Sequence, residues 1–229
     1  MESAPEKVLS AEELFDDVGP AYGIAFKGIP EQEASLQWLL SRLESSSVKP
    51  AKIVDIGCGT GKPVCSTLAA AGHDVLGIDV ASAMIQAARE GVPDAAFEQK
   101  DIRSFDPPGD SYDVATGYFS MIASVTQEDI KGFISKIFRF LKPGGLFVFA
   151  TVPISADSMQ LRWMGRPVVV SSLSPEEAVD TIKMAGFRVE HDAVTKFTPK
   201  GAEAGLCDPD DVWEEPHLFV YASKTDDAP

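Results

Sequence analysis

The sequence has little cysteine, few basic residues for its length and no long hydrophobic run. Its 229 residues include only 3 cysteines, at positions 58, 65 and 207, and no Cys-x-x-Cys pair. A disulfide framework and a structural zinc site are therefore not expected. Lysine and arginine total 20 against 35 acidic residues, a net charge of −15. Because nucleic acids and anionic membranes bind basic patches, we expect neither as a partner.

The longest apolar run, Leu146 to Ile154, is interrupted by Thr151 and Pro153. It is about half as long as a transmembrane helix requires. The first residues, Met1 to Lys7, hold no basic stretch leading into an apolar one, so we expect no secretory signal and a cytoplasmic location. The composition, 45% apolar and 24% charged, is typical of one globular domain with its own core.

From residue 52 onward, short apolar runs alternate with helical periodicity. We expect strands at 53–56, 75–78, 95–98, 112–116, 146–152, 187–197 and 217–223, and helices at 61–71, 82–90, 127–141 and 174–185. Before them, Pro30 opens a helix to about Leu43, and residues 10–26 form two short helical pieces broken at Gly19-Pro20. The alternation predicts right-handed strand–helix–strand units and a parallel sheet with helices on both faces.

A glycine-rich loop follows the first of these strands, in the order Asp55-Ile56-Gly57-Cys58-Gly59-Thr60-Gly61. Glycines let the backbone turn tightly and let a ligand approach it closely. The loop lacks the spacing of a P-loop, and it lacks the Gly-x-Gly-x-x-Gly of a dinucleotide site because Lys62 stands at the third glycine position. Asp79 ends the second strand, where a carboxylate of this topology faces the ribose hydroxyls of a nucleoside.

Residues 52–152 resemble the class I S-adenosylmethionine-dependent methyltransferases. The resemblance rests on five motifs in the family's order: Val-Asp-Ile-Gly-Cys-Gly-Thr-Gly, Gly-Ile-Asp-Val, Gln-Lys-Asp-Ile, Tyr-Asp-Val-Ala-Thr-Gly-Tyr-Phe and Phe-Leu-Lys-Pro-Gly-Gly-Leu-Phe-Val-Phe. It implies an α/β, Rossmann-like sheet of seven strands in the order 3-2-1-4-5-7-6, with strand 7 antiparallel. Phe15-Asp16-Asp17 with Tyr22 also looks like the N-terminal helix of the ubiquinone and menaquinone pathway group.

The resemblance implies a role in S-adenosylmethionine binding for several residues. Those expected at its methionine part are Tyr22, Asp55, Gly57, Cys58 and Gly59, and Gly61 of the same loop is also expected to bind the cofactor. Asp79 would take the ribose hydroxyls, with Val80 beside it, Met84 against the adenine, Asp101 at its amino group and Ile102 on its ring. Tyr118 and Phe119 would face the methyl group and the acceptor.

The acceptor side is predicted from topology. The antiparallel last strand begins at the face where the parallel strands end, and its expected first residue, His217, is the histidine placed to act as a general base. The alternative is a histidine satisfied by a neighbouring carboxylate such as Glu215. Met159, Leu161, Trp163 and Met164, with Trp213, could build an apolar pocket or pack only on one another. The full substrate-binding set is Tyr22, Tyr118, Met121, Trp163, Trp213, Glu214 and His217.

We therefore expect a single methyltransferase domain over residues 1–229, with a helical cover (1–50), a cofactor-binding core (51–152) and acceptor-side elements with the last two strands (153–229). The expected reaction is methyl transfer from S-adenosylmethionine to an oxygen or nitrogen of a small organic acceptor, without a metal ion. A carbon acceptor, a nicotinamide-dependent oxidoreductase and a protein that binds without transferring methyl are the alternatives. Residues 201–217 hold six acids and no Lys or Arg, which disfavours an anionic acceptor.

Overall fold

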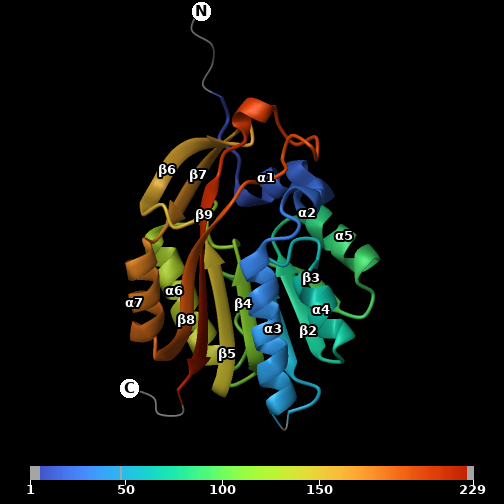
Figure 1. Ribbon diagram of the computed structural model, residues 1–229, viewed down its shortest axis with the longest axis vertical. Coiled ribbons are helices and arrows are strands. Elements are labelled where there is room, and N and C mark those ends of the chain that lie inside the picture. The colour runs from blue at the N-terminus through green and yellow to red at the C-terminus, as the bar shows by residue number, and fades with distance from the viewer. Residues whose placement is uncertain (1–5, 47, 226–229) are drawn as a thin grey trace, which may run out of the picture.

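The computed structural model describes residues 6–46 and 48–225, so most of the expected N-terminal feature at Met1 to Lys7 lies outside the described residues. A seven-stranded sheet forms the centre of the molecule, in the order β3-β2-β1-β4-β5-β9-β8 (Figure 1). Its strands are β1 (Lys52–Ile56), β2 (Asp74–Asp79), β3 (Ala96–Gln99), β4 (Tyr112–Tyr118), β5 (Leu141–Thr151), β8 (Phe187–Phe197) and β9 (Glu215–Lys224). The first five pair in parallel and β9 pairs antiparallel with both neighbours, so the predicted fold and strand order are confirmed.

Helices cover both faces of this sheet because successive strand residues point to opposite sides. Ile53 of β1 belongs to the apolar cluster on one face, and its neighbour Val54 to the cluster on the other. The first face is covered by α3 (Pro30–Ser45), α4 (Val64–Ala70) and α5 (Ser82–Gly91), and the second by α6 (Gln127–Phe140) and α7 (Pro175–Met184). Within the described residues, no helix is long and apolar enough to span a membrane.

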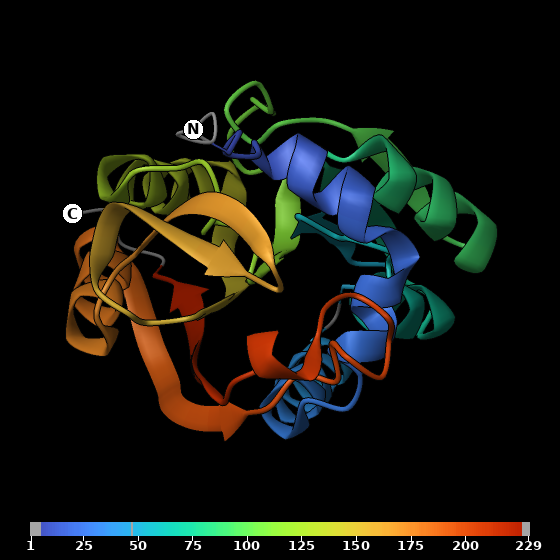
Figure 2. The same cartoon turned by 90° about the horizontal axis from the view of Figure 1, so that it is seen from above.

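The N-terminal segment lies across the end of the sheet where the parallel strands finish (Figure 2). It comprises α1 (Ala11–Val18), the 3₁₀ turn η1 (Gly19–Ala21) and α2 (Tyr22–Ala25), which agrees with the expected break at Gly19-Pro20. Ser10 caps α1 in a capping box with Glu13. Asp16 then accepts hydrogen bonds from the first turn of α5, at Ala83 N (2.8 Å) and Ser82 Oγ (3.2 Å). These bonds fix α1 beside α5.

Residues 156–172 form a β-hairpin, where the sequence suggested only an apolar covering segment. The strands are β6 (Ala156–Trp163) and β7 (Arg166–Ser172), and they make a second, two-stranded sheet. Met159, Leu161 and Trp163 alternate with polar residues, which is the period of a half-buried strand. The hairpin lies over the same end of the main sheet as α1 (Figure 2).

Two expected boundaries are wrong in a way that affects the site. Strand β9 begins at Glu215, two residues before His217, because Glu215 pairs with Phe197 of β8. Helix α4 begins at Val64 and not at 61, since the glycine loop continues through Gly61 to Pro63 before the helix starts. The remaining elements agree with the predicted ones within a few residues, except β5, which starts five residues early at Leu141.

Candidate functional site

The glycine loop forms a cradle between β1 and α4 in which the backbone adopts left-handed conformations. Gly57, Gly59 and Gly61 have φ of 68°, 53° and 73°, values that favour glycine. A Cβ on Gly57 would lie 2.1 Å from Ser120 Cβ, so the loop packs closely on the segment after β4. A Cβ on Gly59 would meet nothing within 4 Å and would occupy the open space of the cradle.

Asp79 connects this loop to β2. Its carboxylate accepts hydrogen bonds from Gly59 N and Ala81 N, both at 2.9 Å, and lines the cavity beside the loop. Burial raises the pKa of Asp79. Since each carboxylate oxygen can accept more than one hydrogen bond, Asp79 can hold the loop and still bind two hydroxyl groups.

Asp55 lies below the loop and is buried. It accepts hydrogen bonds from Thr116 Oγ1 (2.7 Å) and Cys65 Sγ (3.4 Å). Burial raises its pKa to about 6, although the hydrogen bond from Thr116 acts in the opposite direction. A cationic ligand stabilises the ionised form of a buried carboxylate that has few hydrogen-bond donors. Asp55 lines a cavity beside the loop where such a ligand could bind.

Two cavities meet at the glycine loop and contain most of the predicted cofactor residues. One, of about 90 Å³, is lined by Gly57, Gly59, Asp79, Val80, Met84, Ile102, Tyr118 and Phe119. The other, of about 640 Å³, is lined by Tyr22, Asp55, Gly57, Cys58, Gly59, Tyr118 and Phe119 among others. Of the predicted residues, Gly61 and Asp101 line neither cavity.

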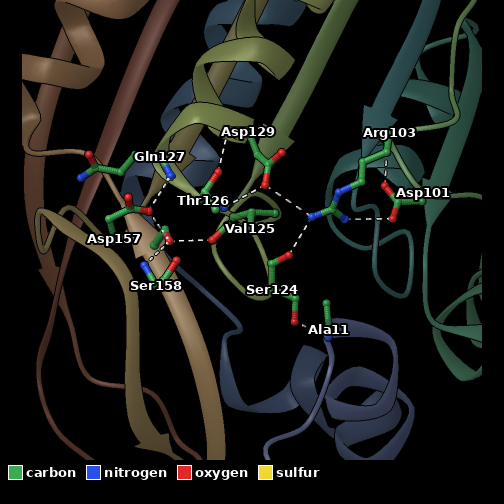
Figure 3. Close-up of polar contacts among 11 residues, drawn as sticks. Ala11, Asp101, Arg103, Ser124, Val125, Thr126, Gln127, Asp129, Asp157 and Ser158 are labelled. Atoms are coloured by element: carbon green, nitrogen blue, oxygen red, sulfur yellow. Dashed lines mark hydrogen bonds and ion pairs between the residues drawn. The ribbon is translucent and has the colours of Figure 1, made fainter.

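Asp101 instead lines a neighbouring shallow groove together with Val80 and Lys100. Its carboxylate accepts hydrogen bonds from Arg103 N (2.7 Å) and Arg103 Nη1 (3.0 Å). Arg103 also donates to Ser124 O (2.7 Å) and lies 3.7 Å from Asp129 Oδ2 (Figure 3). Asp101 is therefore part of a polar network, and its role at an adenine stays a prediction.

A separate apolar cavity of about 330 Å³ lies between α1, the segment after β4, the β6–β7 hairpin and the start of β9. Its aromatic lining residues are Phe15, Tyr22, Phe26, Phe119, Trp163 and Trp213. Its aliphatic lining includes Leu14, Ile122, Ile154, Met159, Leu161, Val168 and Val170. Among the described residues, Glu215 is the single charged side chain that lines it.

Tyr22 and Phe119 join the apolar cavity to the two cavities at the glycine loop, because both line all three. Phe119 has φ of 56°, a left-handed conformation that is uncommon for an aromatic residue. Its backbone N–H donates to Ala150 O over 2.8 Å. Such strained positions cluster at functional sites. Phe119 and Tyr22 therefore mark the place where two ligands would meet.

The structure places Trp163 and Trp213 in the apolar cavity, but four other predicted acceptor residues outside it. Tyr118 lines only the cofactor-side cavities, and its hydroxyl bonds to Ser35 Oγ at 2.7 Å. Met121 is 2% exposed and belongs to the core cluster on the α6 face, because the chain turns at Phe119. Glu214 is exposed and pairs with Lys196 over 2.7 Å.

His217 is the fourth, and the expectation that it faces the acceptor is not met. Its side chain is 0% exposed, and it packs between Phe119 and Phe197 with ring centroids 4.5 and 5.6 Å away. Its Nε2 lies 3.2 Å from Glu215 Oε2. This is the alternative foreseen from the sequence, a histidine satisfied by the neighbouring carboxylate.

Sequence reasoning missed Glu215 as a cavity residue, together with Phe26 and Val170. The sequence predicts Glu215 only as a neighbour of His217 and as one acid of the span 201–217, because it places the start of the strand at His217. Residues two apart on a strand share a face, so an earlier start of β9 would have placed both side chains together. The sequence shows only that Phe26 and Val170 are apolar. Their position in the cavity depends on how α2 and the hairpin fold over the sheet.

The residues at the glycine loop fit the cofactor that the resemblance implies. Gly59 leaves a cradle that a Cβ would fill, and Asp79 presents a buried carboxylate for the ribose. Asp55 offers a second carboxylate for an ammonium group. A nucleoside with a cationic amino acid tail would thus find one buried acid for its hydroxyl groups and a second for its ammonium group.

Comparisons with known proteins agree with this geometry. Residues 53–145 match a family model described as a methyltransferase domain. Trans-aconitate 2-methyltransferase of Paracidovorax citrulli is 36% identical over 110 residues, covering 47% of this chain and 40% of the relative. Sterol 24-C-methyltransferase ERG6B of Gibberella zeae is 29% identical over 160 residues, covering 63% and 41%. The chain thus spans about two fifths of the length of these relatives.

A solved structure extends the likeness to most of the chain. The S-adenosylmethionine-dependent methyltransferase of Mesorhizobium loti is similar with a TM-score of 0.58 and 25% identity, covering 84% of this chain and 99% of the other. The comparisons do not confirm a resemblance to the quinone-pathway group. With this sheet order, glycine cradle and family match, residues 53–145 form a methyltransferase domain, and the fold is that of the S-adenosylmethionine-dependent methyltransferases.

Proposed function

We propose that this protein transfers a methyl group from S-adenosylmethionine to an oxygen or nitrogen of a small, apolar acceptor. The observation that carries the proposal is the junction at Tyr22 and Phe119, where the cavities of the glycine loop meet an apolar cavity of about 330 Å³. The cofactor supplies an electrophilic methyl group, and the protein supplies its position relative to the acceptor.

Each part of the site has a distinct task in this proposal. Gly57 and Gly59 allow close approach of the methionine part, Asp55 receives its ammonium group and Asp79 receives the ribose hydroxyls. Tyr22 and Phe119 form the walls between cofactor and acceptor. The apolar walls exclude water, which favours an in-line transfer between two neighbouring ligands.

The hairpin and the segment after β8 close the acceptor side. Arg166 of β7 donates to Leu206 O over 2.8 Å and forms an ion pair with Asp17 of α1. Lys200 N donates to Ala25 O over 2.8 Å. These contacts connect the three covering segments with one another, so the cavity has walls before an acceptor arrives, and less ordering is required on binding.

The test is a titration of the protein with S-adenosylmethionine and S-adenosylhomocysteine by calorimetry, followed by a screen for S-adenosylhomocysteine release with apolar alcohols, phenols and amines. We expect both cofactor forms to bind, and Asp79→Ala to abolish binding. Release with a neutral or cationic acceptor supports the proposal. Binding without release across the whole panel would indicate a protein that binds without transferring methyl.

A carbon acceptor is the second candidate. The relative from Gibberella zeae carries a C-methyltransferase name, and an apolar cavity of this kind also suits a hydrocarbon acceptor. Mass spectrometry and NMR of the methylated product decide between the candidates, because the new methyl group bonds to oxygen, nitrogen or carbon.

A further inference from the structure

Glu215 is a carboxylate placed in an otherwise apolar cavity. Its side chain is 7% exposed, and the other residues around the cavity are apolar or aromatic, with Tyr22 and the two tryptophans contributing the remaining polar groups. A buried charge is costly unless it has partners. The Glu215 carboxylate must therefore have partners that offset the cost of its burial. Its function depends on which groups its oxygens bind.

Two ring nitrogens hold the Glu215 carboxylate, one from the hairpin and one from its own strand β9. Trp163 Nε1 of the hairpin donates to Oε1 over 3.2 Å, and His217 Nε2 lies 3.2 Å from Oε2. A carboxylate only accepts, so His217 Nε2 carries the proton and donates. The indole and the imidazole fix the carboxylate without occupying all of its lone pairs, because each oxygen accepts up to two hydrogen bonds.

The packing behind His217 prevents it from acting on the cavity directly. Phe197 stacks on its ring and Phe119 packs against it at an angle, and among the described residues Nδ1 has no hydrogen-bond partner. His217 is thus a positioning residue that orients Glu215. The same Phe119 lines the cofactor cavities, so the carboxylate lies near the junction where the two ligands meet.

Resting on the proposed function, we propose that Glu215 selects the acceptor: the cavity takes an apolar molecule that brings one hydrogen-bond donor, a hydroxyl or a protonated amine, and rejects a carboxylate. A donor reaching Glu215 replaces the water that its free lone pairs lose on burial. An acceptor carboxylate would place two negative charges side by side in a medium of low dielectric constant, which is strongly unfavourable.

The neighbouring Glu214 offers a matched control. It is exposed, pairs with Lys196 and does not line the cavity. The substitutions Glu215→Gln and Glu214→Gln therefore remove the same charge one residue apart, inside and outside the cavity. If the acidic segment acted only through its general field, both variants would change binding equally.

The experiment uses three probes of equal shape, adamantane methylamine, adamantane methanol and adamantane carboxylate. Two of the three tryptophans, Trp163 and Trp213, line the cavity, so intrinsic fluorescence reports probe binding. We expect the wild-type protein to bind the amine and the alcohol at least about tenfold more tightly than the carboxylate. Glu215→Gln should abolish this preference, and Glu214→Gln should keep it.

The wild-type protein gives an independent measurement should Glu215→Gln lose its fold. A preference set by a buried carboxylate persists at high salt, whereas one set by exposed acids is screened. A preference lost at high salt, or retained in Glu215→Gln, overturns the inference. If no probe binds, the inference fails, while the S-adenosylmethionine titration and the screen for S-adenosylhomocysteine release still test the proposed function by themselves.

Discussion

The indole N–H of Trp163 donates a hydrogen bond to Glu215 Oε1 over 3.2 Å, and so connects the β6–β7 hairpin to strand β9 across the apolar cavity. Trp163→Phe keeps the apolar ring but removes this donor. A hydrogen bond to a charged group contributes about 1.5–3 kcal/mol, so we expect a loss of unfolding free energy in this range and faster hydrogen exchange in the hairpin.

Trp213→Phe is the control for this prediction. Trp213 lines the same cavity but is 44% exposed, and within residues 6–46 and 48–225 its indole makes no hydrogen bond. Its replacement should leave the hairpin's exchange rates unchanged. Equal effects of the two substitutions would contradict a specific role of the Trp163–Glu215 bond.

Substitutions at glycines can distinguish an effect on stability from an effect on cofactor binding. Gly59→Ala introduces a methyl group that meets no atom of the protein within 4 Å but enters the cradle. We expect a loss of about 1–2 kcal/mol from the left-handed backbone and a much larger loss of S-adenosylmethionine affinity. Gly72→Ala imposes the same kind of strain at φ of 86°, also with nothing within 4 Å and far from the loop, so it should lower stability alone.

Asp55 should make stability and cofactor binding depend on pH. Burial raises its pKa from 3.8 to about 6, so the folded state binds more protons than the unfolded state between these values. Stability from this group therefore falls as pH rises from about 4 to about 6, by up to about 3 kcal/mol. Asp55→Asn should remove this fall in urea unfolding, and Asp74→Asn, at an exposed position on β2, should not.

The same carboxylate should release a proton when the cofactor binds. Below about pH 6 Asp55 is protonated in the free protein, and a cationic ammonium group favours its ionised form. Affinity for S-adenosylmethionine should therefore rise between about pH 5 and about pH 7. Calorimetry in buffers of different ionisation enthalpy measures the released proton. An affinity that does not change with pH would show that Asp55 does not bind the ammonium group.

Tyr118 is predicted to matter for stability and not for the methyl group. Ser35 Oγ donates to Gln32 O over 2.7 Å, so the Tyr118 hydroxyl is the donor in its own 2.7 Å bond with Ser35. Tyr118→Phe should cost about 1 kcal/mol and leave cofactor affinity unchanged. By contrast, Phe119→Leu should weaken binding of both cofactor and acceptor, because Phe119 lines every cavity of the site.

Arg103 is expected to hold the segment after β4 in place. Its guanidinium bonds Asp101 and Ser124 O, and Ser124 Oγ in turn accepts from Ala11 N over 2.9 Å (Figure 3). Arg103→Met should cost about 1 kcal/mol, speed hydrogen exchange around Ser124 and reduce cofactor affinity several-fold. Arg139→Met, which removes only an exposed ion pair with Asp106, serves as the control and should leave affinity unaltered.

The fold and most of the cofactor side could be predicted from the sequence alone. The positions of the glycine loop and of Asp79 depend on local backbone geometry and on where strands end. Motifs at fixed spacing predict both. The cofactor cavities accordingly contain most of the residues expected there. Asp101 is an exception, because a turn that motif spacing does not predict brings its carboxylate into hydrogen bonds with Arg103.

The acceptor side could not be predicted in the same way. The apolar cavity is assembled from α1, a hairpin and β9, which lie up to two hundred residues apart in the sequence, and no local pattern states how such segments pack. One difference of two residues in the start of β9 placed Glu215 on the cavity wall and His217 behind it. Glu215 and His217 share one face of β9, so which of them reaches the cavity depends on the pairing with β8, which fixes where the strand begins, and on the rings packed around His217.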